Sequence, residues 1–102
     1  MFKITYSPGS IYDLLLIKNY IKYTLLNPQA ADRIENEIKK HISFLNFSPK
    51  MYLLVHTSKD GREIRRLPVL KYNVYYSIDE KNLSVDIIRI VYSGADLDQI
   101  AN

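Results

Sequence analysis

The chain has 102 residues, of which 47% are hydrophobic and 25% are charged, and this predicts one globular domain over residues 1–102. It contains no cysteine, which excludes disulfides, thiolate metal sites and cysteine nucleophiles and fits a cytoplasmic location. No apolar run approaches the roughly 18 residues of a membrane span, so we expect no membrane association.

The charge of the chain is unevenly distributed. Residues 59–73 hold five cations against two acids, an excess equal to the net charge of +3 for the whole chain. A basic segment of this kind favours an anionic partner, either nucleic acid or an acidic protein segment. The alternative interpretation is a solvated strand edge that positive charge protects from unwanted pairing.

The N-terminal part of the sequence predicts a strand followed by a helix. Residues 2–6 alternate apolar and polar side chains, as a short strand does. After a break at residues 7–9, Ser10 and Asp13 have the spacing of a capping box, which predicts a helix over residues 10–26. Its apolar side chains recur at helical intervals: Ile11, Leu14, Leu15, Ile17, Ile21 and Leu25.

A second helix is expected to begin at Asn27-Pro28, because asparagine caps helices and proline suits the first helical turn. Ser48-Pro49 is expected to end it. One apolar stripe follows the helix: Ala30, Ile34, Ile38, Ile42 and Leu45. Two amphipathic helices joined by a short turn predict an antiparallel hairpin that packs on a sheet.

Residues 61–92 predict three antiparallel strands, the first with Pro68 near its end, and the other two around a turn at residues 79–82. The last strand is apolar on both faces, which fits either a central position or a bulge. Residues 51–58 are either a strand or an apolar connection, and a short helix is expected from near Asp96. The order predicts an α+β fold: an N-terminal strand and an antiparallel helical hairpin packed on a small, mainly antiparallel sheet of three to four or more strands.

Common catalytic signatures are missing from the sequence. Three glycines form no phosphate-binding loop, and the two histidines, His41 and His56, lie on different predicted elements. We therefore expect no metal ion and no cofactor.

The remaining chemical signal is a group of cations and tyrosines on the predicted strands: Arg62, Arg65, Arg66, Lys71, Tyr72, Tyr75, Arg89 and Tyr92. Arginine binds phosphates and tyrosine rings stack on bases, so this group is a candidate partner-binding or nucleic-acid-binding surface. The plainer interpretation is that tyrosines line the core. We expect this for Tyr72 and Tyr76, which share the phase of Val74 and Ile78, whereas Tyr75 is expected to be more open.

Three segments follow one another in a characteristic order: Arg65-Arg66-Leu67, residues 72–79 as Y-x-φ-x-Y-x-φ-D, and residues 85–92 as φ-x-I-x-R-φ, where φ is apolar. With Ala31-Asp32-Arg33-Ile34 on the second helix, this pattern resembles the RelE/ParE superfamily of bacterial toxins from type II toxin–antitoxin systems. The resemblance covers essentially the whole chain and implies a growth-inhibiting toxin.

The resemblance implies two activities. ParE-like members inhibit DNA gyrase by binding, whereas RelE-like members are ribosome-dependent mRNA endonucleases that use clustered cations with a tyrosine or histidine. Asn73 stands where those nucleases typically have arginine, and residues 93–96 replace basic residues of others. We therefore favour the ParE-like hypothesis. In the RelE-like alternative the catalytic residues are Arg65, Arg66, Arg89 and Tyr92, and a third hypothesis is a non-toxic binding module of the same fold.

Both toxin hypotheses imply a cognate antitoxin as partner, with acidic residues that meet the basic segment. The expected partner-binding or nucleic-acid-binding residues are Arg62, Arg65, Arg66, Lys71 and Tyr75. The expected cellular target is DNA gyrase or, alternatively, the ribosome with its mRNA, and no small-molecule cofactor is implied.

Overall fold

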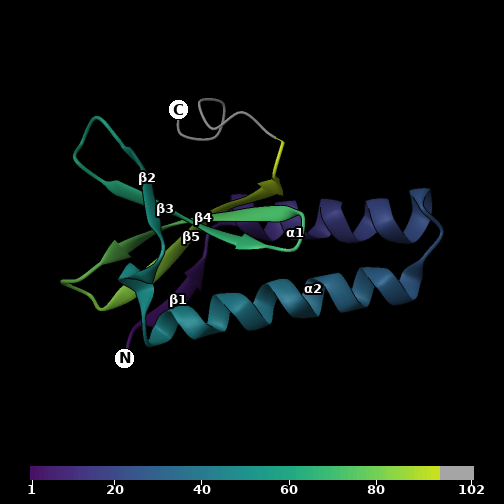
Figure 1. Ribbon diagram of the computed structural model, residues 1–102, viewed down its shortest axis with the longest axis horizontal. Helices are drawn as coiled ribbons and strands as arrows, with labels where there is room; N and C mark the ends of the chain where they lie inside the picture. Colours follow the sequence, from purple (N-terminus) through teal and green to yellow (C-terminus); the bar gives the residue numbers. More distant parts are fainter. Residues whose placement is uncertain (95–102) are drawn as a thin grey trace.

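The structure, a computed structural model, describes residues 1–94, so the helix expected from near Asp96 lies outside the described residues. Figure 1 shows two helices and a sheet. The helices are α1 (Pro8–Asn19) and α2 (Pro28–Ser43), with a π-helical turn at Tyr20–Thr24 and 3₁₀ turns at Phe44–Asn46 and Pro49–Met51. The strands are β1 (Lys3–Tyr6), β2 (Leu53–Thr57), β3 (Glu63–Val69), β4 (Tyr72–Asp79) and β5 (Ser84–Tyr92).

The five strands form one sheet in the order β1-β5-β4-β3-β2. β1 pairs with β5 in parallel, whereas β2, β3, β4 and β5 pair antiparallel in succession. The prediction of an α+β fold with a mainly antiparallel sheet is confirmed. The segment at residues 51–58, left open above, supplies the edge strand β2.

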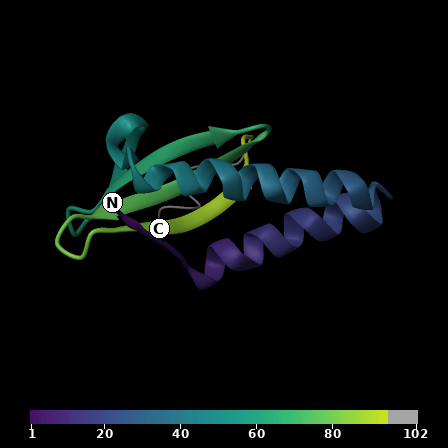
Figure 2. The same cartoon turned by 90° about the horizontal axis from the view of Figure 1, so that it is seen from below.

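The helices form an antiparallel hairpin against one face of the sheet, and the far end of the hairpin extends beyond the sheet (Figure 2). The core between them combines Ile38, Ile42 and Leu45 of the α2 stripe with side chains of β3, β4 and β5. A smaller cluster of Ile21, Ala30 and Ala31 fills the far end of the hairpin. The stripe predicted for the second helix is therefore the main support of the fold.

Both explanations offered for the two-sided apolarity of the last strand hold. β5 lies between β1 and β4, and its pairing with β4 shifts register where Tyr75 pairs with Arg89 and Tyr76 with Ile87. The extra residue, Ile88, changes the phase, so that Ile87 and Ile90 both face the core. This bulge decides which side of the sheet Arg89 occupies.

The start of α1 differs from the prediction. Ser7, not Ser10, caps the helix: its Oγ accepts a hydrogen bond from Ser10 N at 3.0 Å, and Pro8 occupies the first turn. Ser10 is buried and donates its hydroxyl to Ser7 O at 2.8 Å. Pro8 therefore begins the helix rather than breaking the chain, because its missing N–H has no helical partner at that position.

The apolar stripe predicted for α1 is largely wrong. Leu14 and Ile21 are buried, but Ile11, Leu15 and Leu25 are more than half exposed. By contrast, the Asn27 cap is confirmed, with its side chain accepting from Ala30 N at 3.1 Å. α2 ends at Ser43, earlier than expected, and two 3₁₀ turns continue the chain to β2. No helix within residues 1–94 is long and apolar enough to cross a membrane.

Candidate functional site

Arg65 and Arg66, adjacent in the sequence, lie on opposite faces of β3. Arg65 is the cross-strand neighbour of Tyr76, whose side chain belongs to the core beneath the helices, and Arg66 is the neighbour of Tyr75 on the other face. Side chains alternate along a strand, so this separation follows directly from the register. The basic segment predicted at residues 62–71 is therefore not one patch, and this expectation is wrong.

Arg65 is bound to the backbone that leads into β2. Its Nη1 donates to Tyr52 O at 2.8 Å and approaches Lys50 O at 3.5 Å. Tyr76, beside it, donates its hydroxyl to Pro49 O at 2.5 Å, and burial raises the pKa of this phenol to about 12. Together the two side chains hold the turn at Pro49–Met51 against the sheet, which gives Arg65 a structural role.

Arg66, Tyr75 and Arg89 form a cross-strand row on the face away from the helices. This row is the part of the predicted surface that the fold does bring together. However, Tyr75 is only 3% exposed, so the expectation that it is the more open tyrosine is wrong. Its ring is not accessible for stacking on a base.

Arg89 is engaged by Asp13 of α1. Its Nε and Nη2 donate to the two carboxylate oxygens at 2.7 and 2.9 Å, and Asp13 Oδ2 also accepts from Ile90 N at 2.8 Å. The hydrogen bonds to Asp13 raise the pKa of the Arg89 guanidinium. Asp13 thus satisfies a backbone donor on β5 beyond the end of β1 and fixes α1 to that strand, a role that the capping-box interpretation missed.

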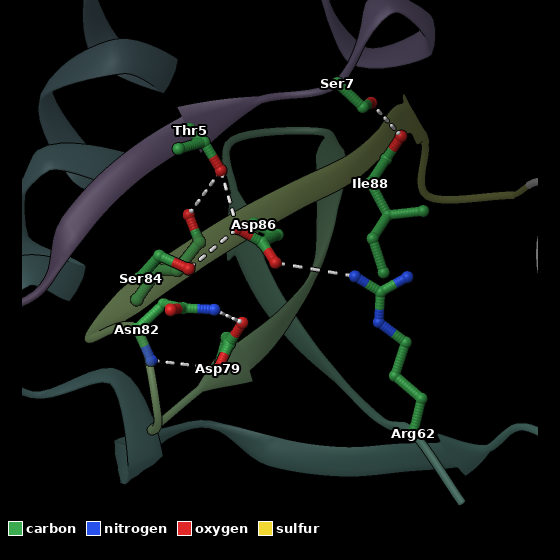
Figure 3. A network of polar contacts seen from close by, with 9 residues as sticks. Thr5, Ser7, Arg62, Asp79, Asn82, Ser84, Asp86 and Ile88 are labelled. Carbon is green, nitrogen blue, oxygen red and sulfur yellow. Dashed lines mark hydrogen bonds and ion pairs between the residues drawn. The ribbon is translucent and has the colours of Figure 1, made fainter. Parts of the chain in front are cut away.

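Arg62 is paired within the chain as well. Its Nη2 lies 3.5 Å from Asp86 Oδ2, while Asp86 Oδ1 accepts from Thr5 Oγ1 at 2.6 Å and from Ser84 Oγ at 3.1 Å (Figure 3). Asp86 lies in register with Ser77 of β4, on the same face as Arg66. A carboxylate on this face opposes the approach of phosphates.

Lys71 and Tyr92 lie at another end of the sheet. Lys71 is exposed in the β3–β4 turn, and its carbonyl accepts from Ser93 N at 2.9 Å. Tyr92 is 61% exposed and is the cross-strand neighbour of Tyr72, with a T-shaped ring contact of 6.3 Å between centroids. Through this pairing Tyr92 lies on the side of Tyr72, away from the row of Arg66 and Arg89.

The four residues of the cleavage hypothesis therefore do not converge. Arg65 and Tyr92 both lie on the helix side of the sheet. Arg65 pairs with Tyr76 and Tyr92 pairs with Tyr72, and these two β4 residues are four positions apart, which is about 13 Å along a strand. Arg66 and Arg89 lie on the other side. A general acid–base site needs its proton donor and its charge-stabilising groups around one reacting atom, which this arrangement does not provide.

The histidines give no second centre. On α2, His41 Nδ1 donates to Glu37 O at 2.8 Å, and His56 lies on β2 opposite Ile64. Within residues 1–94, no three histidine, cysteine, aspartate or glutamate side chains are grouped to hold a metal ion.

The surface of the hairpin is unusually apolar. A groove of about 450 Å³ runs between α1 and α2, beside the exposed side chains of Ile11 and Leu15. Its lining is Tyr6, Ile11, Leu14, Leu15, Lys18, Glu35 and Lys39. An apolar groove rimmed by charged residues is typical of a site for a partner helix.

Comparison with known proteins identifies the family of the chain. Residues 4–97 match the family described as the ParE toxin of the type II toxin–antitoxin system parDE. The chain belongs to this family, which confirms the RelE/ParE resemblance and the expectation of a type II toxin that is ParE-like. No curated protein matches the chain in sequence.

Solved structures share the fold at low sequence identity. A chain of the chromosomal ParDE TA system from P. aeruginosa superposes with a TM-score of 0.72 at 17% identity, covering 90% of this chain and 96% of that chain. The toxin–antitoxin complex RelBE2 from Mycobacterium tuberculosis gives 0.60 at 18%, covering 89% and 96%. The archaeal RelE–RelB complex from Pyrococcus horikoshii OT3 gives 0.62 at 14%, covering 93% and 98%.

Proposed function

We propose that the protein inhibits bacterial growth by binding DNA gyrase and has no hydrolytic activity of its own. The observation that carries this proposal is that Arg65 and Arg89, two of the three cations of a cleavage site, lie on opposite sides of the sheet and are each engaged within the chain. Arg65 holds backbone carbonyls on one side of the sheet, and Arg89 holds Asp13 on the other. Membership of the ParE toxin family supports the same conclusion.

The test is a direct comparison of the two targets with one purified protein. We expect it to inhibit supercoiling by gyrase and to leave mRNA intact on translating ribosomes. The matched variant is Arg66→Ala, because Arg66 is half-buried and its side chain makes no hydrogen bond or ion pair within residues 1–94. Growth inhibition that survives this change agrees with the proposal. Ribosome-dependent cleavage that Arg66→Ala abolishes contradicts it and supports the nuclease alternative.

We also propose a cognate antitoxin that covers the groove between α1 and α2. Ile11 and Leu15 are exposed at this groove, and its rim carries Lys18 and Lys39, both paired with Glu35. The antitoxin would then inhibit the toxin by occupying this surface. Co-expression with the product of the neighbouring reading frame is expected to restore growth, and an Ile11→Ser/Leu15→Ser variant is expected to escape this rescue.

A further inference from the structure

Tyr20 of the helical hairpin lies near Tyr72 of β4 and Tyr92 of β5. Tyr12 and Tyr23 lie on the same flank of the hairpin as Tyr20, because they are eight positions before it and three positions after it. Tyr92 contacts Tyr72, with the two rings at 78° to one another. Burial raises the pKa of the Tyr72 phenol, and the nearby phenol of Tyr20 raises it further. We call this area the tyrosine surface. It consists of Tyr12, Tyr20, Tyr23, Tyr72 and Tyr92.

The tyrosine surface is exposed and separate from the groove between the helices. Tyr20 is 55% exposed and Tyr23 is 64% exposed, and Leu16 on the same flank is 48% exposed. Tyr12 and Leu16 each follow a groove residue, Ile11 and Leu15, by one position, which is about 100° around a helix. A helix that occupies the groove therefore leaves this flank uncovered.

Within residues 1–94, the exposed charge beside Tyr20, Tyr23, Tyr72 and Tyr92 is positive, because the segments that carry them, residues 14–31, 64–78 and 87–94, contain no acidic residue. Asp13, which adjoins Tyr12, is buried and paired with Arg89. Lys22 lies over the Tyr23 ring at 5.2 Å from its centroid, and the exposed Lys71 adjoins Tyr72. Tyrosine concentrates binding energy at protein interfaces because it is large, rigid and able to hydrogen bond at its tip.

These features select one kind of occupant. Two nearby lysines are too few for nucleic acid, whose binding rests on many phosphate contacts. A second copy of the chain, docked symmetrically, would bring its own Lys22 and Lys71 against the same area. An acidic protein surface matches both the lysines and the phenol hydroxyl groups.

We infer that the tyrosine surface is where the toxin docks on an acidic surface of its protein target, leaving the groove to the antitoxin. The target is gyrase if the proposed function holds, and this inference rests on it. Binding through exposed aromatic anchors requires no catalytic group, in keeping with the separated cations of the sheet.

The experiment uses two matched double variants on the same helical hairpin. Tyr20→Ser/Tyr23→Ser removes exposed rings of the tyrosine surface, and Ile11→Ser/Leu15→Ser changes exposed groove residues. We expect the first to weaken inhibition of gyrase supercoiling by at least about tenfold while keeping antitoxin binding. We expect the second to weaken antitoxin binding by a similar factor while keeping gyrase inhibition. Lys22→Glu is expected to weaken gyrase inhibition with its helix intact. Thermal unfolding within a few degrees of the wild type, an order-of-magnitude limit for surface changes, verifies that each variant is folded.

The outcomes separate the two proposals. If the wild type inhibits supercoiling and the Tyr20→Ser/Tyr23→Ser and Lys22→Glu variants inhibit equally well, the docking inference is wrong and the proposed function stands. If the wild type leaves supercoiling unchanged, the proposed function is wrong and the docking inference is overturned with it. Loss of antitoxin binding in the tyrosine variant, without loss of gyrase inhibition, would assign the surface to the antitoxin and also overturn it.

Discussion

The two helices of the hairpin use their apolar residues in opposite ways. α2 turns Ile38, Ile42 and the following Leu45 completely into the core, whereas α1 leaves Ile11, Tyr12, Leu15 and Leu16 about half exposed or more. α1 places Leu14 and Ile17 against the core and is also attached by polar contacts, from Ser7 and Asp13 to β5. The difference shows that α2 contributes the larger share of the core, whereas α1 keeps an exposed apolar surface.

The sharpest test of this difference is truncation of matched positions. Ile42→Ala is expected to lower the free energy of unfolding by about 2–5 kcal/mol, because it leaves a cavity in the main core. Leu16→Ala on α1 is expected to change it by no more than about 0.5 kcal/mol. Urea unfolding of both variants measures the two values, and similar losses would mean that α1 is as deeply packed as α2.

The polar attachment of α1 is tested at Asp13. Asp13→Ala leaves the Arg89 guanidinium and the Ile90 N–H without their acceptor, so we expect a loss of about 2–3 kcal/mol. Arg89→Ala should cost less, because the side chain of Arg89 is 38% exposed. A double-mutant cycle measures their coupling, and strictly additive losses would show that the ion pair does not hold the helix.

The hydrogen bond from the Tyr76 hydroxyl to Pro49 O, in the turn that follows α2, depends on pH in the alkaline range. The pKa of Tyr76 rises from 10.0 to about 12 on folding, so its stabilising contribution is complete below pH 10 and is lost as the pH rises to about 12. Tyr76→Phe removes the hydrogen bond to Pro49 O, at a cost of about 1 kcal/mol below pH 10, and should lose stability less steeply above it. Denaturant unfolding at pH 9 to 12 measures both, and parallel profiles would contradict the assignment.

The caps of the two helices should differ slightly. Asn27→Ala removes only the cap of α2, at about 1 kcal/mol, whereas Ser7→Ala also removes a hydroxyl bond of 2.8 Å to Ile88 O on β5. We therefore expect Ser7→Ala to cost more than Asn27→Ala by about 0.5 kcal/mol, the contribution of one additional, partly buried hydrogen bond. Thermal unfolding compares them, and a larger loss for Asn27→Ala would reverse the comparison.

Sequence reasoning worked best where periodicity and capping are local. It located four of the five strands, leaving β2 open, together with the Asn27 cap and the α2 stripe, and it identified the toxin superfamily mainly from residues 61–92. It failed on α1, where an apolar sequence does not reveal which side faces the core when most of the apolar side chains stay exposed. It also grouped Arg65 with Arg66, although the alternation of side chains along a strand was itself enough to place them on opposite faces.

The sequence by itself thus determined the elements, their order and the family, because caps, turns and hydrophobic periods act between residues a few positions apart. Only the tertiary structure decided which partners the charged residues contact. Asp13 and Arg89 are separated by 76 positions and meet because a bulge in β5 and the capped start of α1 bring them together. The gathering of tyrosines from α1, β4 and β5 depends on the same packing, since no local rule relates side chains so far apart in the chain.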